Sequence, residues 1–551
     1  MKQSFIHSVL IFLGALMLFV PFLGEVHLFD WDELNFAEAA REMLLTQNYA
    51  LVQINFETFL EKPPLFFWMQ AISMSIFGVN EFAARFPNAI CGAVTLVVIY
   101  NIGRRWFDTR LAWWWVLTYL GALLPVLYFK SGIIDPWFNL FIFLGVYYGI
   151  RFTSKYQERK KRVVIMSGFF LGLALLIKGP VGLLVFLLAG AVYFVVKRFY
   201  GFPRLPHILL FLAVFFLTGE SWFLYHAATG TPEVVAEFIR VQSNLFSSDV
   251  AGQAQPFWYH FVVILIGCFP ISLFAMPAVP RMRLQTYERD HFHLWMKILF
   301  WVVLILFSIV KTKIVHYSSM AYFPLTFLAA LTLYRFETRN RRLHIGLTVL
   351  GILIAILLGA TYSALPWINV WGARVNWSEI DAFTAAQFTQ EVSWSVLTRW
   401  AGPVFVLLSI VFLLGLSAGK VSWVRYQLLV GLLMSLTLII HITPQAEIYL
   451  QRSAIDFYKR AGAEGAYIHP IGMKSYGYLF YSEKSGPLPK PDDMRDGKWL
   501  LTGDIDKPAY FVGRNTRKEK TLKEFPQLQV VDEKGGYVLY YRPIDQGLGG
   551  S

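Results

Sequence analysis

An acidic pair, Asp32 and Glu33, stands directly after the first long apolar segment of the chain. The residues that follow have helical spacing, with small and apolar side chains three or four positions apart. A carboxylate at the mouth of a cavity could accept a proton from a nucleophile. From residue types alone, an amphipathic helix at the membrane interface, capped by Asp32, is an equally good interpretation.

A second polar element, Glu61 and Lys62, comes directly before Pro63 and Pro64. Two prolines stop a helix and hold the chain extended. The pair is therefore presented at the edge of an aromatic, apolar stretch. Lys62 could bind a phosphate as a point charge. The alternative is a lysine whose ammonium group reaches back to the membrane interface.

Further charged residues stand at the ends of other apolar segments. Asp135 precedes a proline, so a helix cap competes with a functional role. Lys178 lies between two apolar segments, and Lys313 and His316 end another one. Charged residues this close to the apolar core usually face a water-filled cavity or a substrate. Arg240, in a long polar loop, is a candidate anion binder or an ordinary solvated arginine.

The composition sets the class of protein. Of 551 residues, 56% are hydrophobic and only 15% charged, against about a quarter charged in soluble domains. The net charge is +13, but the basic residues lie in short loops between apolar runs. That distribution is typical of membrane topology and not of nucleic-acid binding. The two cysteines, Cys91 and Cys268, lie in apolar runs and predict inert packing. No Walker-type or dinucleotide-binding motif is present.

Hydropathy predicts an all-α polytopic membrane protein with about thirteen transmembrane helices. The predicted spans are 4–23, 86–103, 111–129, 136–151, 163–178, 180–196, 205–225, 257–280, 293–310, 315–334, 343–364, 398–417 and 423–442. The apolar segment 64–78 is shorter and predicts an interfacial or re-entrant element. Basic residues concentrate in alternate short loops, so the N-terminus is expected on the cytoplasmic side. The polar clusters then all fall on the outer side.

The chain is expected to have two parts. Residues 1–442 form a transmembrane domain, with juxtamembrane helices in 30–80 and outer loops at 226–256 and 365–397. Residues 443–546 are polar and predict a small extracytoplasmic α/β domain, with a helix over 454–463 and strands at 510–512, 528–531 and 537–541. Residues 547–551 are interpreted as a cloning remnant.

Taken in order, these motifs resemble the GT-C superfamily of membrane glycosyltransferases. The similarity is greatest to the branch with the lipid A aminoarabinose transferases and the dolichyl-phosphate-mannose protein mannosyltransferases. It rests on the order, spacing and common sidedness of short elements. They are Asp32-Glu33 with Phe36-Ala37-Glu38 and Arg41-Glu42-Met43, Glu61-Lys62-Pro63-Pro64-Leu65, Arg85-Phe86-Pro87, Asp135, Lys178-Gly179-Pro180, and Lys313 with Tyr317.

The resemblance implies inverting transfer of a sugar from a polyprenyl-phosphate donor to a lipid or protein acceptor. Asp32 would activate or orient the acceptor, with Glu33 as a second candidate acid. Lys62 would bind the donor phosphate. Arg240 and Lys313, two cations singled out by their position in the sequence, are further candidates for that role. Asp135, Lys178, His316 and Tyr317 would line the cavity. Glu61 matches a position that binds a divalent metal in relatives, but Gln242 stands where relatives have a histidine, so no cofactor is required by the sequence.

The resemblance also implies a location. We expect a monomer in the bacterial inner membrane, surrounded by lipid, with the active site and the C-terminal domain in the periplasm. Two other functions fit part of the pattern. A flippase for lipid-linked sugars could use the same cationic cavity, although no paired broken helices or repeats are evident. A non-catalytic assembly or receptor protein would leave the charges at the membrane edge unexplained.

Overall fold

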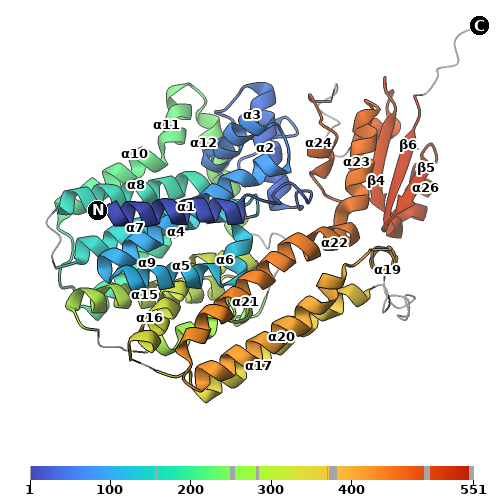
Figure 1. The fold of residues 1–551 in the computed structure, drawn as a ribbon. Helices are drawn as coiled ribbons and strands as arrows, with labels where there is room; N and C mark the ends of the chain where they lie inside the picture. The colour runs from blue at the N-terminus through green and yellow to red at the C-terminus, as the bar shows by residue number, and fades with distance from the viewer. Residues whose placement is uncertain are drawn as a thin grey trace, which may run out of the picture.

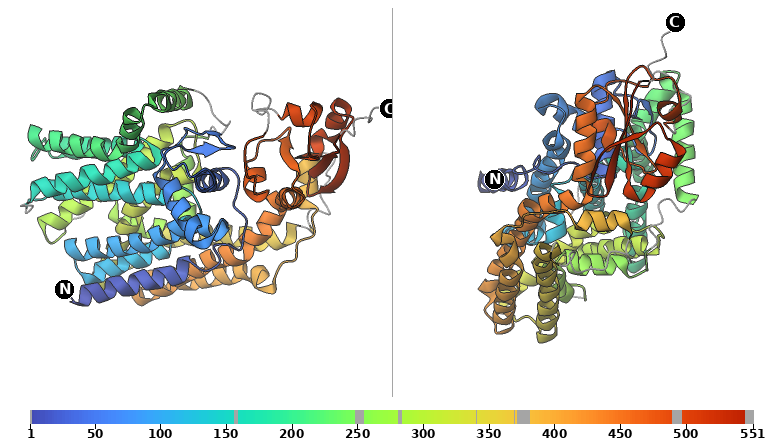
Figure 2. Two further views of the ribbon diagram at one scale, coloured as in Figure 1. Left: turned by 90° about the horizontal axis from the view of Figure 1, so that it is seen from above. Right: turned by 90° about the vertical axis from the view of Figure 1, so that its right-hand side faces the viewer.

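The computed structural model describes residues 2–155, 159–247, 255–280, 284–339, 341–368, 370, 381–488 and 497–544. A large helical body holds the N-terminus at one end, and a small sheet domain sits at the opposite end (Figure 1). Seen from above, the long helices of the body run roughly side by side, and the sheet domain lies beyond their ends (Figure 2, left). The predicted class, a helical membrane protein with a small C-terminal α/β part, is confirmed.

Each of the thirteen predicted spans corresponds to a helix or a broken helix. The helices are α1 (Lys2–Phe19), α4 (Glu81–Trp106), α5 (Thr109–Leu120) with α6 (Leu123–Tyr128), α7 (Asp135–Thr153), α8 (Lys160–Lys178), α9 (Val181–Val196), α10 (Leu205–Gly219) with α11 (Ser221–Ala228), α13 (Tyr259–Gly267) with α14 (Ile271–Ala275), α15 (Tyr287–Ile309), η2 (Val315–Ala321) with α16 (Tyr322–Arg339), α17 (Ile345–Ala364), α20 (Val396–Ser417) and α21 (Val424–Thr437).

Length and apolar composition decide which helices are able to cross a membrane alone. Five helices in the described part of the chain pass, and seven do if each of two sharply bent helix pairs forms one span. The bent pairs are α10 with α11, at 63°, and α13 with the helical turns that follow it, at 105°. The chain is therefore multi-pass, and the count of thirteen stays a prediction.

The polar segment after the first span folds into short elements that lie on the helical body. α2 (Asp32–Thr46) is followed by the hairpin of β1 (Gln53–Ile54) and β2 (Glu57–Thr58), and then by α3 (Leu65–Phe77). Every residue of α2 from Glu33 to Met43 is buried. An amphipathic helix resting on the membrane surface would expose its polar face. α2 is instead enclosed by protein, with α3 and α24 (Gly477–Tyr481) packed against it.

The two long outer loops contain helices of their own. α12 (Pro232–Ser247) lies within the loop predicted at 226–256, and α19 (Ala382–Phe388) within the loop predicted at 365–397. The exposed apolar side chain of Ile239 and the exposed Arg240 are both on α12. Residues 248–254 and 371–380 of these loops lie outside the described residues.

The last span continues without interruption into the C-terminal part. One helical run extends from Val421 to Ala463, so the boundary predicted at residue 443 falls inside it. The run comprises η5 (Val421–Trp423), α21, η6 (Leu438–Ile442), α22 (Thr443–Glu447), η7 (Ile448–Arg452) and α23 (Ser453–Ala463).

The C-terminal sheet has the strand order β3-β4-β6-β5. β3 (Tyr467–Ile471) runs parallel to β4 (Ala509–Arg514), and β6 (Tyr537–Arg542) runs antiparallel to β4 and to β5 (Gln529–Lys534). α25 (Lys498–Thr502) and α26 (Lys518–Glu524) complete the domain. Its own small core includes Leu500, Phe511 and Val538, and the predicted helix and strands are present.

Candidate active site

Two carboxylates meet one histidine where the helices α2 and α7 begin. Asp32 is the first residue of α2, and Asp135 is the first residue of α7. His316 Nε2 lies 3.7 Å from Asp32 Oδ2 and 3.9 Å from Asp135 Oδ2. The Asp32 side chain keeps 39% of its surface exposed, whereas that of Asp135 keeps 4%. Asp32 is therefore the acid that an incoming molecule can reach.

A lysine and a tyrosine complete this group. Lys178, the last residue of α8, donates from Nζ to Asp135 Oδ1 at 2.7 Å. A cation is favoured at the C-terminal end of a helix and an anion at the N-terminal end, so both helix dipoles support this ion pair. The ammonium group of Lys178 also lies 5.4 Å from the centre of the Tyr317 ring. Asp135 Oδ2 is buried and accepts no hydrogen bond in the described part of the chain.

Lys62 lies within electrostatic range of the same residues. Its pKa is lowered, first by burial and then by the neighbouring charge of Lys178. Glu61, Asp32 and Asp135 act in the opposite direction and raise the pKa of Lys62. A bound phosphate would add negative charge there and favour the protonated ammonium. The structure thus brings together Asp32, Lys62, Asp135, Lys178, His316 and Tyr317, which we call the outer cluster.

Three residues from the sequence analysis have other surroundings. Glu33 turns into the protein interior and pairs with Arg85. Arg240 is 71% exposed and pairs with Glu237 on its own helix at 2.6 Å. Lys313 is buried, and its Nζ donates to the backbone oxygen of Gln255 at 2.8 Å. Their assigned roles remain predictions.

The residues at Glu61 do not fit a metal site. Gln242 Nε2 donates to the backbone oxygen of Glu61 at 2.9 Å, so a hydrogen-bond donor faces this turn where a metal would need a ligand. Across the described ranges, no group of three or more histidine, cysteine, aspartate or glutamate side chains could hold a metal ion. We therefore derive no reaction step through a metal.

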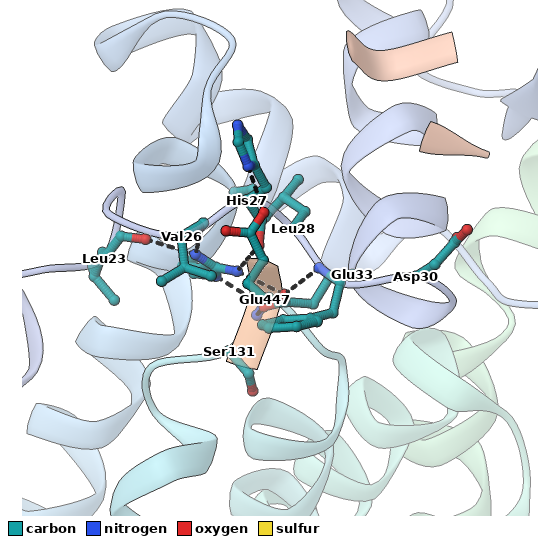
Figure 3. A network of polar contacts seen from close by, with 12 residues as sticks. Leu23, Val26, His27, Leu28, Asp30, Glu33, Ser131 and Glu447 are labelled. Atoms are coloured by element: carbon teal, nitrogen blue, oxygen red, sulfur yellow. Dashed lines mark hydrogen bonds and ion pairs between the residues drawn. The ribbon is translucent and has the colours of Figure 1, made fainter. Parts of the chain in front are cut away.

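Arg85 belongs to one of the short motifs, Arg85-Phe86-Pro87, for which the sequence predicts no separate role. Its guanidinium donates to both oxygens of Glu33, at 3.0 and 2.8 Å, and to the backbone oxygens of Leu23, Val26 and His27. Glu33 also accepts from the backbone N–H groups of Phe29 and Gly132. Figure 3 shows this network around Glu33, with Leu23 and Val26 on one side. It ties the loop before Asp32 to the loop before Asp135.

The C-terminal part also contacts the loop before Asp32. Glu447, fully buried, accepts from His27 Nδ1 at 2.7 Å and from the guanidinium of Arg452 (Figure 3). The backbone N–H of Leu28 donates to the hydroxyl of Tyr481 at 2.7 Å. His27 and Leu28 lie more than 400 residues from Glu447 and Tyr481, so no local sequence signal could have identified these two contacts.

A second buried charge group lies further along α2. Arg41 pairs with both oxygens of Glu38, at 2.7 and 2.6 Å, and donates to the backbone oxygen of Lys484. Glu42 accepts from the backbone N–H groups of Asn55 and Phe56. Burial, and after it the nearby charge of Glu38, raises the pKa of Glu42 to about 8. This group fastens α2 to the C-terminal domain.

Comparison with known proteins extends these observations. Residues 61–226 match the family model described as dolichyl-phosphate-mannose-protein mannosyltransferase. The chain is 25% identical over 359 residues to the undecaprenyl phosphate-alpha-4-amino-4-deoxy-L-arabinose arabinosyl transferase of Wigglesworthia glossinidia brevipalpis, covering 64% of this chain and 63% of the relative. It is 28% identical over 351 residues to the protein of the same description from Shewanella sediminis, covering 62% of each. The chain thus spans slightly less than two thirds of these relatives.

The fold comparison covers more of the chain. The crystal structure of ArnT from Cupriavidus metallidurans bound to undecaprenyl phosphate matches with a TM-score of 0.76 and 21% identity over 97% of each chain. The apo form of that protein matches with a TM-score of 0.74. The chain therefore has the fold of ArnT over nearly its whole length, and residues 61–226 match the protein-mannosyltransferase family model, in line with the resemblance that its motifs predicted.

Proposed function

We propose that the chain is an inverting glycosyltransferase that moves a sugar from a polyprenyl-phosphate donor to an acceptor, which is a lipid A-like glycolipid or a protein hydroxyl. The observation that carries the proposal is the outer cluster, where an accessible acid, Asp32, faces His316 beside the ion pair of the buried Asp135 with Lys178. The relatives described as undecaprenyl phosphate-dependent arabinosyl transferases support the donor class.

The proposed reaction uses the carboxylate of Asp32 as the base. Asp32 takes the proton of the acceptor while the acceptor atom forms a bond to the anomeric carbon of the sugar. The bond from that carbon to the phosphate oxygen breaks on the opposite face, and its electron pair leaves with the polyprenyl phosphate. Negative charge accumulates on the departing phosphate, so a fixed cation beside it stabilises the transition state more than the ground state.

Lys62 is our candidate for that cation. Lys178 already has a carboxylate partner, Asp135, 2.7 Å away. Within the described residues, the Lys62 ammonium forms one hydrogen bond, to the backbone oxygen of Glu61, and no ion pair. An ammonium without a carboxylate partner is free to take a phosphate oxygen. His316, between two carboxylates, would fix the orientation of Asp32 before the acceptor arrives.

The proposed location follows the charge pattern of the loops. Basic residues concentrate in alternate loops, which supports an N-terminus in the cytoplasm of a bacterial cell and an outer cluster in the periplasm. The C-terminal domain, which contacts the loop before Asp32, would then be periplasmic as well. We further propose that the chain works as a monomer, because one chain supplies every residue of the outer cluster.

A transfer assay with purified protein tests the proposal. A radiolabelled undecaprenyl-phosphate sugar is incubated with detergent-solubilised protein and envelope acceptors, and transferred label is counted. Asp32→Asn and Lys62→Ala should each lower transfer by at least about 100-fold, because a general base contributes about 10²–10⁴-fold and one contact that stabilises the transition-state charge about 10²–10³-fold. Full activity in both variants would refute these residue roles.

The acceptor is found by comparing cells with and without the gene. Mass spectrometry of envelope lipids and glycoproteins should show one class that loses a sugar in the deletion strain. Sealed vesicles provide the contrast with a flippase. Labelled donor that crosses the membrane without any acceptor being modified would favour transport over transfer.

A further inference from the structure

A separate cavity lies at the other end of α4 from the outer cluster. It has a volume of about 560 Å³ and is formed between α4 and α7. Arg104, Arg105 and Tyr147 give it a polar end, and Val97, Val98 and Leu144 give it an apolar wall. None of these residues belongs to the outer cluster or to its supporting network.

The position of this cavity follows from helix geometry. Arg85 and Arg105 stand on the same continuous helix, α4, which passes the length and composition test for a membrane span. Twenty residues at 1.5 Å each separate them by about 30 Å, which is the thickness of the hydrocarbon core of a bilayer. Since Arg85 lies beside the outer cluster, Arg104 and Arg105 lie at the opposite membrane interface.

Arg104 and Arg105 have no pairing partner among the residues that the structure describes. Both are exposed, and neither forms an ion pair or a hydrogen bond with another of the residues that the structure describes. By contrast, Arg289 and Arg425, two other arginines of the chain, pair with the carboxylates of Asp108 and Glu337. Unpaired guanidinium groups with an apolar wall beside them match a ligand with a phosphate at one end and a hydrocarbon chain at the other.

We propose that this cavity binds one anionic phospholipid of the surrounding membrane. Its phosphate would lie against Arg104 and Arg105, with the hydroxyl of Tyr147 as a further donor. One acyl chain would follow Val97, Val98 and Leu144 toward the bilayer centre. The ligand is distinct from the polyprenyl phosphate of the proposed reaction, since the two sites lie at opposite interfaces.

Native mass spectrometry of the full-length, delipidated protein tests this site. The probes are phosphatidylglycerol, phosphatidylcholine and inorganic phosphate, each titrated separately. The unmodified protein should retain one phosphatidylglycerol in preference to phosphatidylcholine. The double variant Arg104→Gln with Arg105→Gln should weaken phosphatidylglycerol binding by about 30-fold, or about 2 kcal/mol, because each interfacial arginine contributes about 1 kcal/mol.

A matched control removes the same charge nearby. Arg159 and Arg162 are exposed at the start of α8, next in the chain after α7, and do not line the cavity. Arg159→Gln with Arg162→Gln should leave phosphatidylglycerol binding within about twofold of the unmodified protein. An equal loss in both double variants would show a general effect of surface charge and would overturn the proposal.

A third variant separates shape from charge. Leu144→Trp narrows the cavity and keeps both arginines, so it should reduce phosphatidylglycerol binding at least about tenfold while thermal unfolding shows that the protein is intact. Binding that survives Leu144→Trp unchanged would contradict a lipid held inside the cavity. Inorganic phosphate that binds as tightly as phosphatidylglycerol would contradict a role for the acyl chain and overturn the lipid as ligand.

Discussion

Replacing Glu33 by glutamine should destabilise the protein, although its neighbour Asp32 can be changed without that effect. Glu33 is buried, and its carboxylate faces the equally buried guanidinium of Arg85 at 2.8 Å. Glutamine keeps the size but turns an amide toward that guanidinium, so a buried positive charge loses its counter-charge. Breaking a buried ion pair in this way costs about 3–5 kcal/mol.

The chain has a built-in reporter for this measurement. Its only two cysteines, Cys91 and Cys268, are both buried. A thiol-reactive fluorophore therefore labels the protein only as it unfolds, and heating in detergent gives an unfolding midpoint. With an unfolding entropy of about 2.1 cal/mol/K per residue, the loss corresponds to a midpoint about 3–4 °C lower.

The matched control is the adjacent residue. Asp32→Asn changes a side chain that is 39% exposed and 3.7 Å from its nearest charged partner, so the midpoint should stay within about 1 °C while transfer is lost. Arg85→Gln should cost at least as much as Glu33→Gln, because Arg85 also donates to three backbone oxygens.

A double-mutant cycle decides whether the two residues act as a pair. The variant that combines Glu33→Gln with Arg85→Gln should lose less stability than the sum of the single changes, because it leaves no unpaired charge. An unchanged midpoint in Glu33→Gln, or simple additivity in the cycle, would refute this account of Glu33.

The same unfolding assay tests three other predictions. Lys178→Met should lower the midpoint because it leaves Asp135 buried without its cation, and adding Asp135→Asn should restore part of the loss. Glu42 keeps its proton in the folded protein up to about pH 8, whereas in the unfolded chain its pKa is 4.5. The contribution of Glu42 to the free energy of unfolding is therefore fully present below pH 4.5 and is lost as the pH rises toward 8. In Glu42→Gln the stability should decline less over this pH range. Glu447→Gln should cost about 1–3 kcal/mol, because it removes the charge shared by His27 and Arg452; no change would argue against this link.

The outer cluster could be predicted because its members stand at the ends of apolar segments. Loop parity places Asp32, Asp135, Lys178 and His316 at one membrane face, and the structure brings these four together. Residue types alone could not separate Asp32 from Glu33, because both are acids at a helix start, and only the family resemblance favoured Asp32. The two acids differ because Glu33 pairs with Arg85. Arg85 is 52 residues away in the sequence, so no periodic pattern reveals this pairing.

The burial of α2 could not be predicted from the sequence either. With Glu38, Arg41 and Glu42, the helix has the composition of a surface helix, and the sequence favoured an interfacial position as strongly as a functional one. The structure encloses it because these charges find partners within the protein, on α2 itself and on the segment around Lys484. A charged side chain can be buried when it is paired and hydrogen-bonded, and only tertiary contacts show that it is.

Adjacent residues on a helix point about 100° apart, and this explains how one acidic pair can serve two purposes. Glu33 points inward and, through Phe29 and Gly132, holds the loops that precede Asp32 and Asp135. Asp32 points toward His316 and remains accessible. A reacting acid must be held within about half an ångström of its productive position. The buried Glu33–Arg85 pair, which is hydrogen-bonded to both loops, can provide that rigidity. In the proposed enzyme, Glu33 is thus a positioning residue for both carboxylates of the outer cluster, and Asp32 is the one that meets the acceptor.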